Sequence, residues 1–241
     1  MGYTASMLHH RFIDQARKQA DKIAIRDKAT GNDLPYSRAL VASLILARRL
    51  RKLERGRIGI MLPTSAGGAL AVVASLLGGL TPVMINYSTG AAKNCRYAQK
   101  QCDFKVIVTA RPLLEKTGCE ELPNMVFIED ILASLGGFEK GLAFVKSKLP
   151  GGLLKKMSGP ADPERPAVIL FTSGSEKEPK VVQLSHRNIL SNIDSFSDMM
   201  DIYEMDRLLA VLPYFRITNN AVLELGYVQQ LFGYDVAATQ L

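Results

Sequence analysis

The regular alternation of short apolar runs with amphipathic segments constrains the fold of this chain more than any other feature. Apolar runs typical of buried strands occur at residues 21–26, 57–63, 81–86, 104–109 and 124–128. Segments with helical periodicity lie around them, at residues 8–20, 37–53, 66–77, 89–102 and 111–116. Parallel strands need a crossover connection, which is usually a helix. The pattern therefore predicts an α/β fold, in which a mostly parallel sheet carries helices on both faces.

One uncharged stretch could also be interpreted as a membrane span. Residues 66–85 carry no charge and are about long enough to cross a bilayer. The stretch is interrupted by Gly78, Gly79 and Pro82, however. We therefore predict a buried helix, a glycine stop and then a buried strand.

Residues that could bind a metal ion are few and scattered. Cys95, Cys102 and Cys119 have no histidine near them in the sequence, which suits a reducing compartment better than a disulfide framework or a metal site. His9 and His10 are expected at the exposed start of the first helix, without an acidic or cysteine partner nearby. No metal site is expected.

A strand, a loop of small residues and a second short strand organise the later part of the chain. Val168–Phe171 is an apolar run of the kind that a parallel sheet buries on both faces. The residues that follow offer hydroxyl and backbone N–H groups: Thr172, Ser173, Gly174 and Ser175. With Lys180 close behind, this loop is a candidate cradle for nucleotide phosphates. The alternative is a hydroxyl-rich turn that only caps its neighbours.

The loop resembles the signature of the adenylate-forming ligases, which include acyl-CoA and acyl-carrier-protein synthetases, luciferases and peptide-synthetase adenylation domains. The matching residues are Thr172, Ser173, Gly174, Ser175, Glu176, Pro179 and Lys180. Ser185-His186 falls where that family has a Ser/Thr-His pair. Residues 82–90 and 169–176 look like the synthetase part of bacterial acyl-carrier-protein synthetase/2-acylglycerophosphoethanolamine acyltransferase proteins. The resemblance implies the N-terminal part of the large domain of such a ligase.

The chemistry that this resemblance implies is activation of a fatty acid by ATP and Mg²⁺, in connection with phospholipid acyl turnover. The carboxylate would become acyl-AMP, and the thiol of acyl carrier protein or CoA would then take the acyl group. Thr172, Ser173, Ser175 and Lys180 would hold the departing pyrophosphate, beside Gly174 and Glu176 in the same loop. A non-fatty carboxylate, such as an aryl acid, stays open as the substrate.

The chain also departs from the family pattern, which supports an alternative function. Lys177 and Val181 stand where the family usually has glycine. In the element expected to line the acyl pocket, Phe215 fits the pattern, while Arg216 and Asn219 take the usual His and Gly positions. Motifs of the second half of these enzymes are missing, so we expect this chain to be inactive alone, either as a fragment or as a shortened relative. The alternative is a non-catalytic module of the same fold that acts in binding or scaffolding.

The alternation breaks at residues 131–166, which suggests three regions. Residues 1–130 would form a first α/β subdomain, residues 131–166 an amphipathic basic insertion and linker, and residues 167–241 the loop strand with the start of a second subdomain. Within the insertion, residues 138–156 mix apolar and basic side chains, as a segment at an anionic membrane surface does. An ordinary surface helix explains the same pattern.

The remaining expectations concern partners and location. The net charge is +7, but no aromatic-basic interleaving or zinc spacing points to nucleic acid. The chain opens without a long apolar run typical of a signal peptide. We therefore expect a cytoplasmic protein, peripheral to the inner face of the membrane if residues 138–156 bind lipid. A sheet cut within a domain would leave an open edge, so self-association is also expected.

Overall fold

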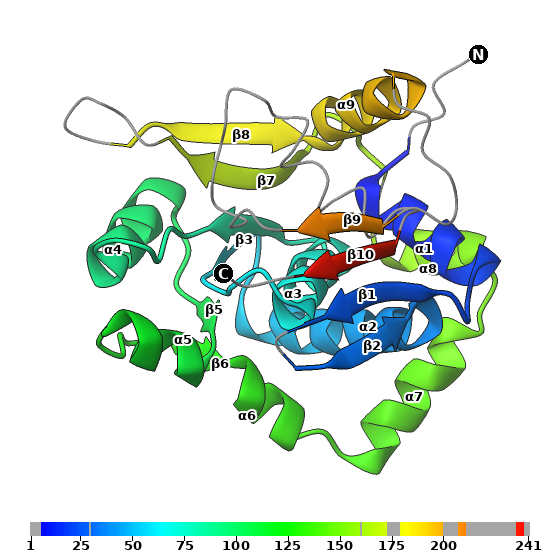
Figure 1. Ribbon diagram of the computed structural model, residues 1–241, viewed down its shortest axis with the longest axis horizontal. Coiled ribbons are helices and arrows are strands. Elements are labelled where there is room, and N and C mark those ends of the chain that lie inside the picture. The colour runs from blue at the N-terminus through cyan, green and yellow to red at the C-terminus, as the bar shows by residue number, and fades with distance from the viewer. Residues whose placement is uncertain are drawn as a thin grey trace.

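The computed structural model of the protein describes residues 6–28, 30–159, 161–172, 179–199, 207–210 and 235–238, with side chains up to residue 195. Within these described residues, the chain forms two sheets and nine helices (Figure 1). The predicted α/β fold with a mostly parallel sheet is confirmed.

The larger sheet has six strands in the order β6-β5-β3-β4-β7-β8. Their bounds are β3 (Arg57–Ile60), β4 (Thr81–Met84), β5 (Ile107–Thr109), β6 (Met125–Phe127), β7 (Pro166–Phe171) and β8 (Val181–Ser185). The first five are parallel, and β8 is antiparallel to β7. Val83 of β4 pairs with Ile169 of β7, so the loop strand joins the sheet formed by the first half of the chain.

The smaller sheet has the order β2-β1-β10-β9. Its strands are β1 (Ile23–Asp27), β2 (Asn32–Pro35), β9 (Arg207–Ala210) and β10 (Asp235–Ala238). β2 runs antiparallel to β1, while β10 is parallel to both β1 and β9. The apolar run at residues 206–213 predicts a strand, and β9 lies within it. The sequence gives no indication of β10, and β2 forms where Gly31, Asn32 and Asp33 predict only a turn.

Helices cover both faces of the larger sheet. Their bounds are α1 (Leu8–Lys18), α2 (Tyr36–Leu53), α3 (Ala66–Leu77), α4 (Ala91–Cys102), α5 (Arg111–Thr117), α6 (Ile128–Ala133), α7 (Gly137–Ser147), α8 (Gly151–Met157) and α9 (His186–Met199). Successive strand residues point to opposite faces. Val108 and Leu170 therefore join the core beneath α1, α2 and α3, whereas Ile107 and Ile169 join the core beneath α4 and α5.

The uncharged stretch at residues 66–85 folds as predicted. α3 ends at Leu77, Gly79 has a φ of +72°, and β4 begins at Thr81. Burial accounts for the missing charges, because β4 is buried at every position. Within the described part of the chain, no helix is both long and apolar enough to cross a membrane.

Two local predictions are wrong. Ser37 is a favoured capping residue type just before a helical run, which predicts it as the cap. It does not cap α2, because that helix already begins at Tyr36 and Pro35 occupies the capping position without a side-chain hydrogen bond. His9 and His10 are buried rather than exposed, with exposed fractions of 4% and 8%. They are covered because α1 packs against α8 and α9 as well as against α2 and α3.

Candidate functional site

The two ends of the candidate phosphate loop are held together by the β7–β8 hairpin. Thr172 N–H donates to the carbonyl oxygen of Lys180 at 3.0 Å, and Lys180 N–H donates to Thr172 Oγ1 at 3.2 Å. The Lys180 side chain is exposed, and within the described part of the chain no carboxylate forms an ion pair with it. The structure therefore brings two predicted site residues together and places an exposed cation, without an ion pair to any described residue, beside the loop.

The other predicted site residues cannot be placed in the same way. Ser173, Gly174, Ser175 and Glu176 lie outside the described residues. The expected pocket residues Phe215 and Arg216 lie outside them as well. Their roles stay predictions.

Tyr97 of α4 fixes the far end of the loop, a role that the sequence did not suggest. Its hydroxyl donates to the carbonyl oxygen of Pro179 at 2.7 Å. Its ring meets the ring of Phe171 edge to face, with 5.9 Å between the centroids. Tyr97 lies off the buried stripe of α4 formed by Cys95, Ala98 and Cys102, so periodicity alone gave no signal for it.

A second polar turn follows the carboxyl end of β4. Asn86 Oδ1 accepts hydrogen bonds from Ser88 N at 2.8 Å and from Ser88 Oγ at 2.7 Å. Asn94 of α4 donates to the carbonyl oxygens of Asn86 and Thr89, both at 2.8 Å. Because β4 and β7 are parallel neighbours, this turn and the candidate loop lie at the same edge of the sheet. In open α/β sheets, ligands bind outside this edge.

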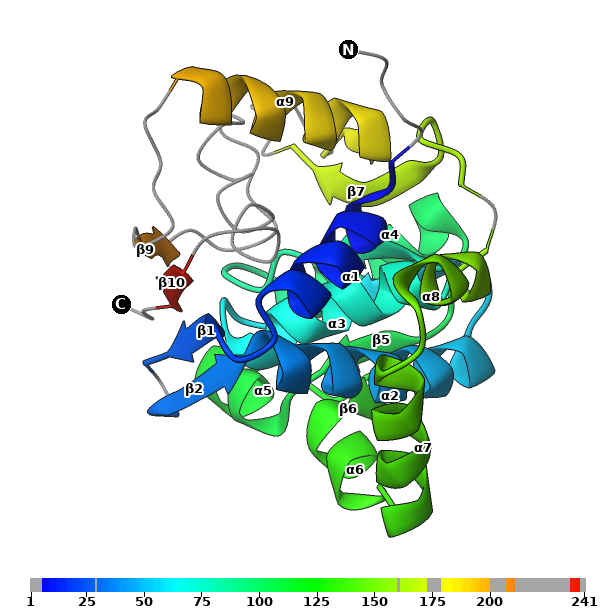
Figure 2. The same cartoon turned by 90° about the vertical axis from the view of Figure 1, so that its right-hand side faces the viewer.

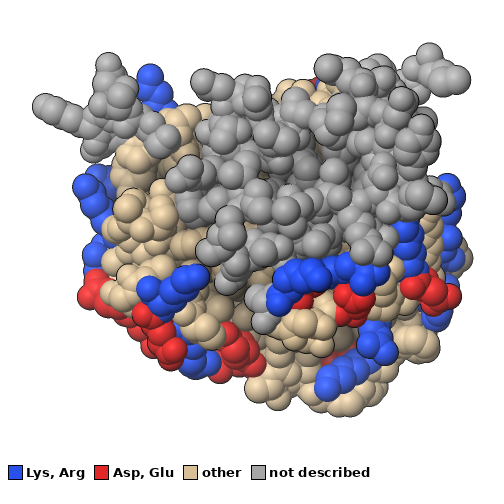
Figure 3. Space-filling model, viewed as in Figure 1, with Lys and Arg blue, Asp and Glu red and all other residues tan. Residues whose placement is uncertain are grey.

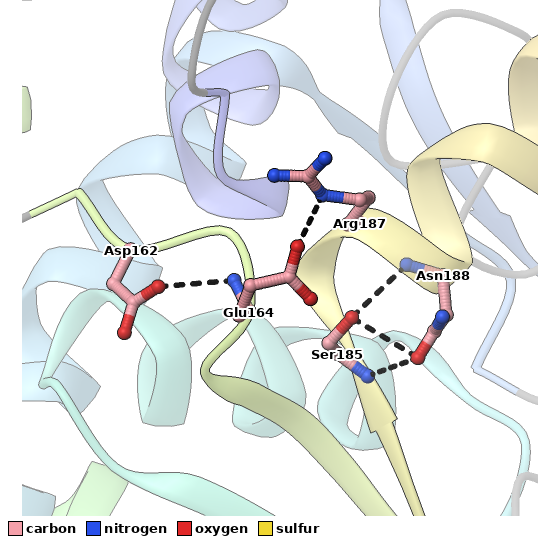
Figure 4. A network of polar contacts seen from close by, with 5 residues as sticks. All are labelled: Asp162, Glu164, Ser185, Arg187 and Asn188. Carbon is pink, nitrogen blue, oxygen red and sulfur yellow. Dashed lines mark hydrogen bonds and ion pairs between the residues drawn. The ribbon is translucent and has the colours of Figure 1, made fainter.

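The junction from β8 to α9 is a reciprocal cap. Ser185 Oγ accepts from Asn188 N at 3.1 Å, and Asn188 Oδ1 accepts from Ser185 N at 2.9 Å (Figure 4). Ser185 and Asn188 are both favoured capping residue types, and the structure confirms Ser185 as the cap. The two bonds satisfy N–H groups that a helix start otherwise leaves open. Arg187 pairs with Glu164 beside it, which ties α9 to the segment before β7.

His186 of the family's Ser-His pair has a structural position here. Its Nδ1 accepts a hydrogen bond from Leu8 N at 3.2 Å, and its ring centroid lies 5.5 Å from that of His9. His9 in turn lies 4.6 Å from His10. All three histidines of the chain therefore meet where α1 joins α9.

Ser158 fixes the tautomers of this histidine cluster (His9, His10 and His186). Its hydroxyl donates to the carbonyl oxygen of Lys155 at 2.6 Å, so its lone pairs accept from Nε2 of His9 at 3.1 Å and of His10 at 3.3 Å. His9 Nδ1 is then a buried acceptor without a partner in the described part of the chain. In that part, no group of three or more His, Cys, Asp or Glu is arranged to hold a metal ion.

Burial keeps these histidines neutral near pH 7. Burial first, and then the neighbouring His10, His186 and Arg165, lower the pKa of His9 to about 2. Burial and Arg165 lower the pKa of His186 to about 4. Burial likewise lowers the pKa of His10. The cluster is thus suited to packing rather than to proton transfer near neutral pH.

Comparison with known proteins places this geometry in context. The family model described as AMP-binding enzyme matches residues 12–229. Long-chain-fatty-acid–CoA ligase 1 of Schizosaccharomyces pombe is 25% identical, over 92% of this chain and 36% of the ligase. Phenyloxazoline synthase MbtB of Mycobacterium tuberculosis is 25% identical, over 85% of this chain and 13% of the synthase. The chain thus spans about a third or less of the length of these curated relatives.

Solved structures show the same fold. The N-terminal domain of FACL13 from Mycobacterium tuberculosis superposes with a TM-score of 0.75 at 18% identity, over 98% of this chain and 57% of that one. The o-succinylbenzoate coenzyme A synthetase of Bacillus subtilis, solved in complex with ATP and magnesium ion, gives a TM-score of 0.72 at 18% identity. This match covers 94% of the present chain and 56% of the synthetase.

Proposed function

Since this chain belongs to the AMP-binding enzyme family, with residues 12–229 matched, we propose that it is the N-terminal portion of an ATP-dependent acid–thiol ligase. The observation that carries the proposal is the hairpin base of the candidate loop. Thr172 and Lys180 are hydrogen bonded across it, and the Lys180 side chain is exposed. We propose a fatty acid as the carboxylate substrate and acyl carrier protein or CoA as the acceptor, in phospholipid acyl turnover.

The described residues fit the phosphates of ATP. Lys180 provides a positive charge without an ion-pair partner in the described part of the chain, and Thr172 can still donate its hydroxyl proton. ATP would be held by these two residues and by the predicted loop residues Ser173, Gly174, Ser175 and Glu176, with Mg²⁺ among the phosphates. When bound, ATP supplies the AMP group that makes the carboxylate reactive. The protein's own part is to orient the phosphates and to offset their charge.

A non-catalytic binding module of the same fold is the competing proposal. Its sequence basis is the pair of residues at glycine positions, of which Val181 lies in the described part of the chain. Val181 is a strand residue that pairs with Phe171, and it packs against the core beneath α4 and α5. β-branched residues suit such a position, so Val181 itself does not oppose a phosphate-binding loop.

We also propose that residues 138–156 bind an anionic membrane surface. Self-association of the protein is part of the same proposal. The support for membrane contact is that α7 carries exposed Phe138 and Phe144 together with Lys140 and Lys146. We propose as well that the chain is divided into a first α/β subdomain at residues 1–130, a basic insertion and linker at residues 131–166, and the loop strand with the start of a second subdomain at residues 167–241.

Non-hydrolysable acyl-AMP mimics distinguish these proposals. We expect the chain to bind a mimic with a long alkyl chain more tightly than one with an aryl group, because each buried methylene contributes about 0.8 kcal/mol. Isothermal titration across a series of alkyl lengths measures this directly. Affinity that is independent of alkyl length would contradict a fatty acid substrate, and absence of binding to every mimic would favour the non-catalytic module.

A further inference from the structure

A basic groove lies between α2, the end of α3, α7 and α8, away from the candidate loop. Its volume is about 380 Å³. Its apolar lining consists of Leu44, Ala47, Leu77, Leu154 and Met157. Its basic lining consists of Arg48, Arg51, Lys52 and Lys146, and no aspartate or glutamate contributes to it. The groove thus combines an apolar floor with four positive charges.

The helix geometry explains why both kinds of side chain meet here. Leu44, Arg48 and Arg51 recur at spacings of four and three residues along α2, so they share one helix face. At the end of α3, a Cβ atom on Gly78 would lie 3.1 Å from Cγ of Arg51, so the absence of a side chain there lets α2 and α3 approach. Figure 2 shows α7 and α8 crossing the same side of the molecule as the second half of α2.

Within the described part of the chain, the groove cations differ from neighbouring basic residues because they form no ion pair. Arg49, on the same helix, pairs with Glu139, and Lys155 pairs with Asp14 at 2.6 Å. Among the described residues, Arg48, Arg51, Lys52 and Lys146 form no ion pair. On the face of the molecule shown in Figure 3, by contrast, basic and acidic side chains are interspersed. Glu139 lines an adjoining pocket with Arg48 and Lys146, but it pairs with Arg49. The groove therefore concentrates positive charge that no ion pair among the described residues neutralises.

The two helices that border the groove, α7 and α8, also carry exposed apolar side chains, of which Met157 lines the groove itself. Phe144 and Val145, next to Lys146 on α7, are 55% and 62% exposed. On α8, Leu153 and Met157 are 45% and 44% exposed. Large apolar side chains gathered around a basic site are typical of surfaces that enter the boundary between lipid head groups and acyl chains.

We propose that this groove binds the phosphate head group of an anionic phospholipid in a bilayer. Arg48, Arg51, Lys52 and Lys146 surround the phosphate, while Phe144, Val145 and Met157 contact the adjoining acyl region. The four cations are complementary in charge to a negative head group, and the apolar lining and the exposed apolar side chains beside it suit contact with the lipid chains. The inference deepens the proposed membrane contact by naming its ligand and residues, and it needs neither ATP nor an active ligase.

Vesicle binding of the full chain tests this inference. The probe is a vesicle of phosphatidylcholine with phosphatidylglycerol, compared with phosphatidylcholine alone, in a co-sedimentation assay without nucleotide. The groove variant carries Arg48→Gln, Arg51→Gln, Lys52→Gln and Lys146→Gln. The control variant, with the same net charge, carries Lys93→Gln, Lys100→Gln, Lys105→Gln and Lys116→Gln at exposed positions. Because each basic residue near an anionic surface strengthens binding about fivefold, the groove variant should bind at least about 100-fold more weakly.

Each outcome decides for or against the lipid site. Selective loss of binding in the groove variant, with the control variant close to the parent protein, supports it. Equal losses in both variants would show general attraction by the +7 net charge and overturn the inference. It would also be overturned by absence of vesicle binding, or by free glycerol phosphate binding the groove as tightly as vesicles do. Because nucleotide is absent throughout, failure here leaves the proposed ligase function untouched.

Discussion

Lowering the pH from 7 to 5 is expected to reduce the free energy of unfolding by about 4 kcal/mol, with His9 and His186 contributing about 2 kcal/mol each. In the unfolded chain both titrate near 6.5, whereas in the folded protein their pKa values are about 2 and about 4. Between pH 6.5 and 5 the unfolded state therefore binds more protons than the folded state, so stability falls as the pH falls. Urea unfolding at a series of pH values measures the change.

The surroundings of the histidine cluster explain why the free energy of unfolding falls, rather than rises, as the pH falls. Protonated His9 would carry an Nδ1–H group into a buried position that has no acceptor in the described part of the chain. Arg165 repels a charge on His9 and on His186, and Lys155 repels one on His10. Asp14 and Asp162 act in the opposite direction on His10 and His186, but they do not outweigh burial.

Variants of similar shape separate the contribution of the histidine cluster to the pH dependence of stability from the contribution of other titrating groups. Gln at position 9 can replace Nε2 in the contact with Ser158, and Asn at position 186 can replace Nδ1 in the contact with Leu8. We expect His9→Gln/His186→Asn to flatten the dependence between pH 7 and 5. Stability between pH 8 and 7 provides the internal control, since there the histidines are neutral in the folded state and mostly neutral in the unfolded chain. A parent protein equally stable at pH 7 and 5 would contradict the buried cluster.

The second large effect is expected for Gly59→Val, which should destabilise the protein by about 3 kcal/mol through overpacking. A Cβ atom at this position in β3 would lie 2.6 Å from Cε2 of Phe104 and 3.1 Å from Ile107 and Ile85. All three neighbours are buried, so they have little room to move. For a chain of this size, the melting temperature should fall by about 10 °C.

A matched glycine supplies the control. Gly141 lies on α7, and a Cβ atom there would meet nothing within 4 Å. Gly141→Val should leave the melting temperature unchanged or raise it slightly, because valine has a higher helix propensity than glycine. Adding Phe104→Leu to Gly59→Val should recover part of the loss. Equal melting temperatures for Gly59→Val and the parent would show that the core beneath α4 and α5 is looser than described.

Features set by local periodicity could be predicted, and features set by distant contacts could not. The limits of α3 and the succession of β1 and β3 to β8 along the chain follow from apolar runs and turn residues, whereas β2 was not predicted. β10 was missed because Asp235–Ala238 has little strand character, and its pairing with β1 depends on a partner about 200 residues away in the sequence. The apolar run at residues 222–232 predicts a helix, and it lies outside the described residues.

For the histidine cluster, one local signal predicted burial correctly, and one contact had no local signal at all. His9 lies three and four residues before Phe12 and Ile13, so the helical period already placed it on the buried face of α1. The general preference of histidine for partly exposed positions predicts the opposite, and the helical period prevails here. The approach of His186 to Leu8 spans 178 residues and has no local signal.

The sequence predicted the two ends of the candidate loop, but it did not predict the Tyr97 contact that holds one of these ends. Thr172 and Lys180 meet as the strand–loop–strand pattern required. The contact from Tyr97 to Pro179 depends on α4 crossing beside β7, which sequence spacing does not reveal. Val181 shows the reverse case, because a residue that departs from the family's glycine is explained by its place in β8.

The most direct test of the central claim is the affinity of the chain for ATP·Mg²⁺, measured by isothermal titration for the parent, Lys180→Ala and Lys116→Ala. Lys116 is an exposed lysine on α5 and serves as the control. Loss of one charge-assisted contact removes about 1.5–3 kcal/mol, so Lys180→Ala should weaken ATP binding about 10-fold or more while Lys116→Ala leaves it unchanged. No ATP binding by the parent, or equal affinities for the parent and Lys180→Ala, would contradict a phosphate site at the β7–β8 hairpin.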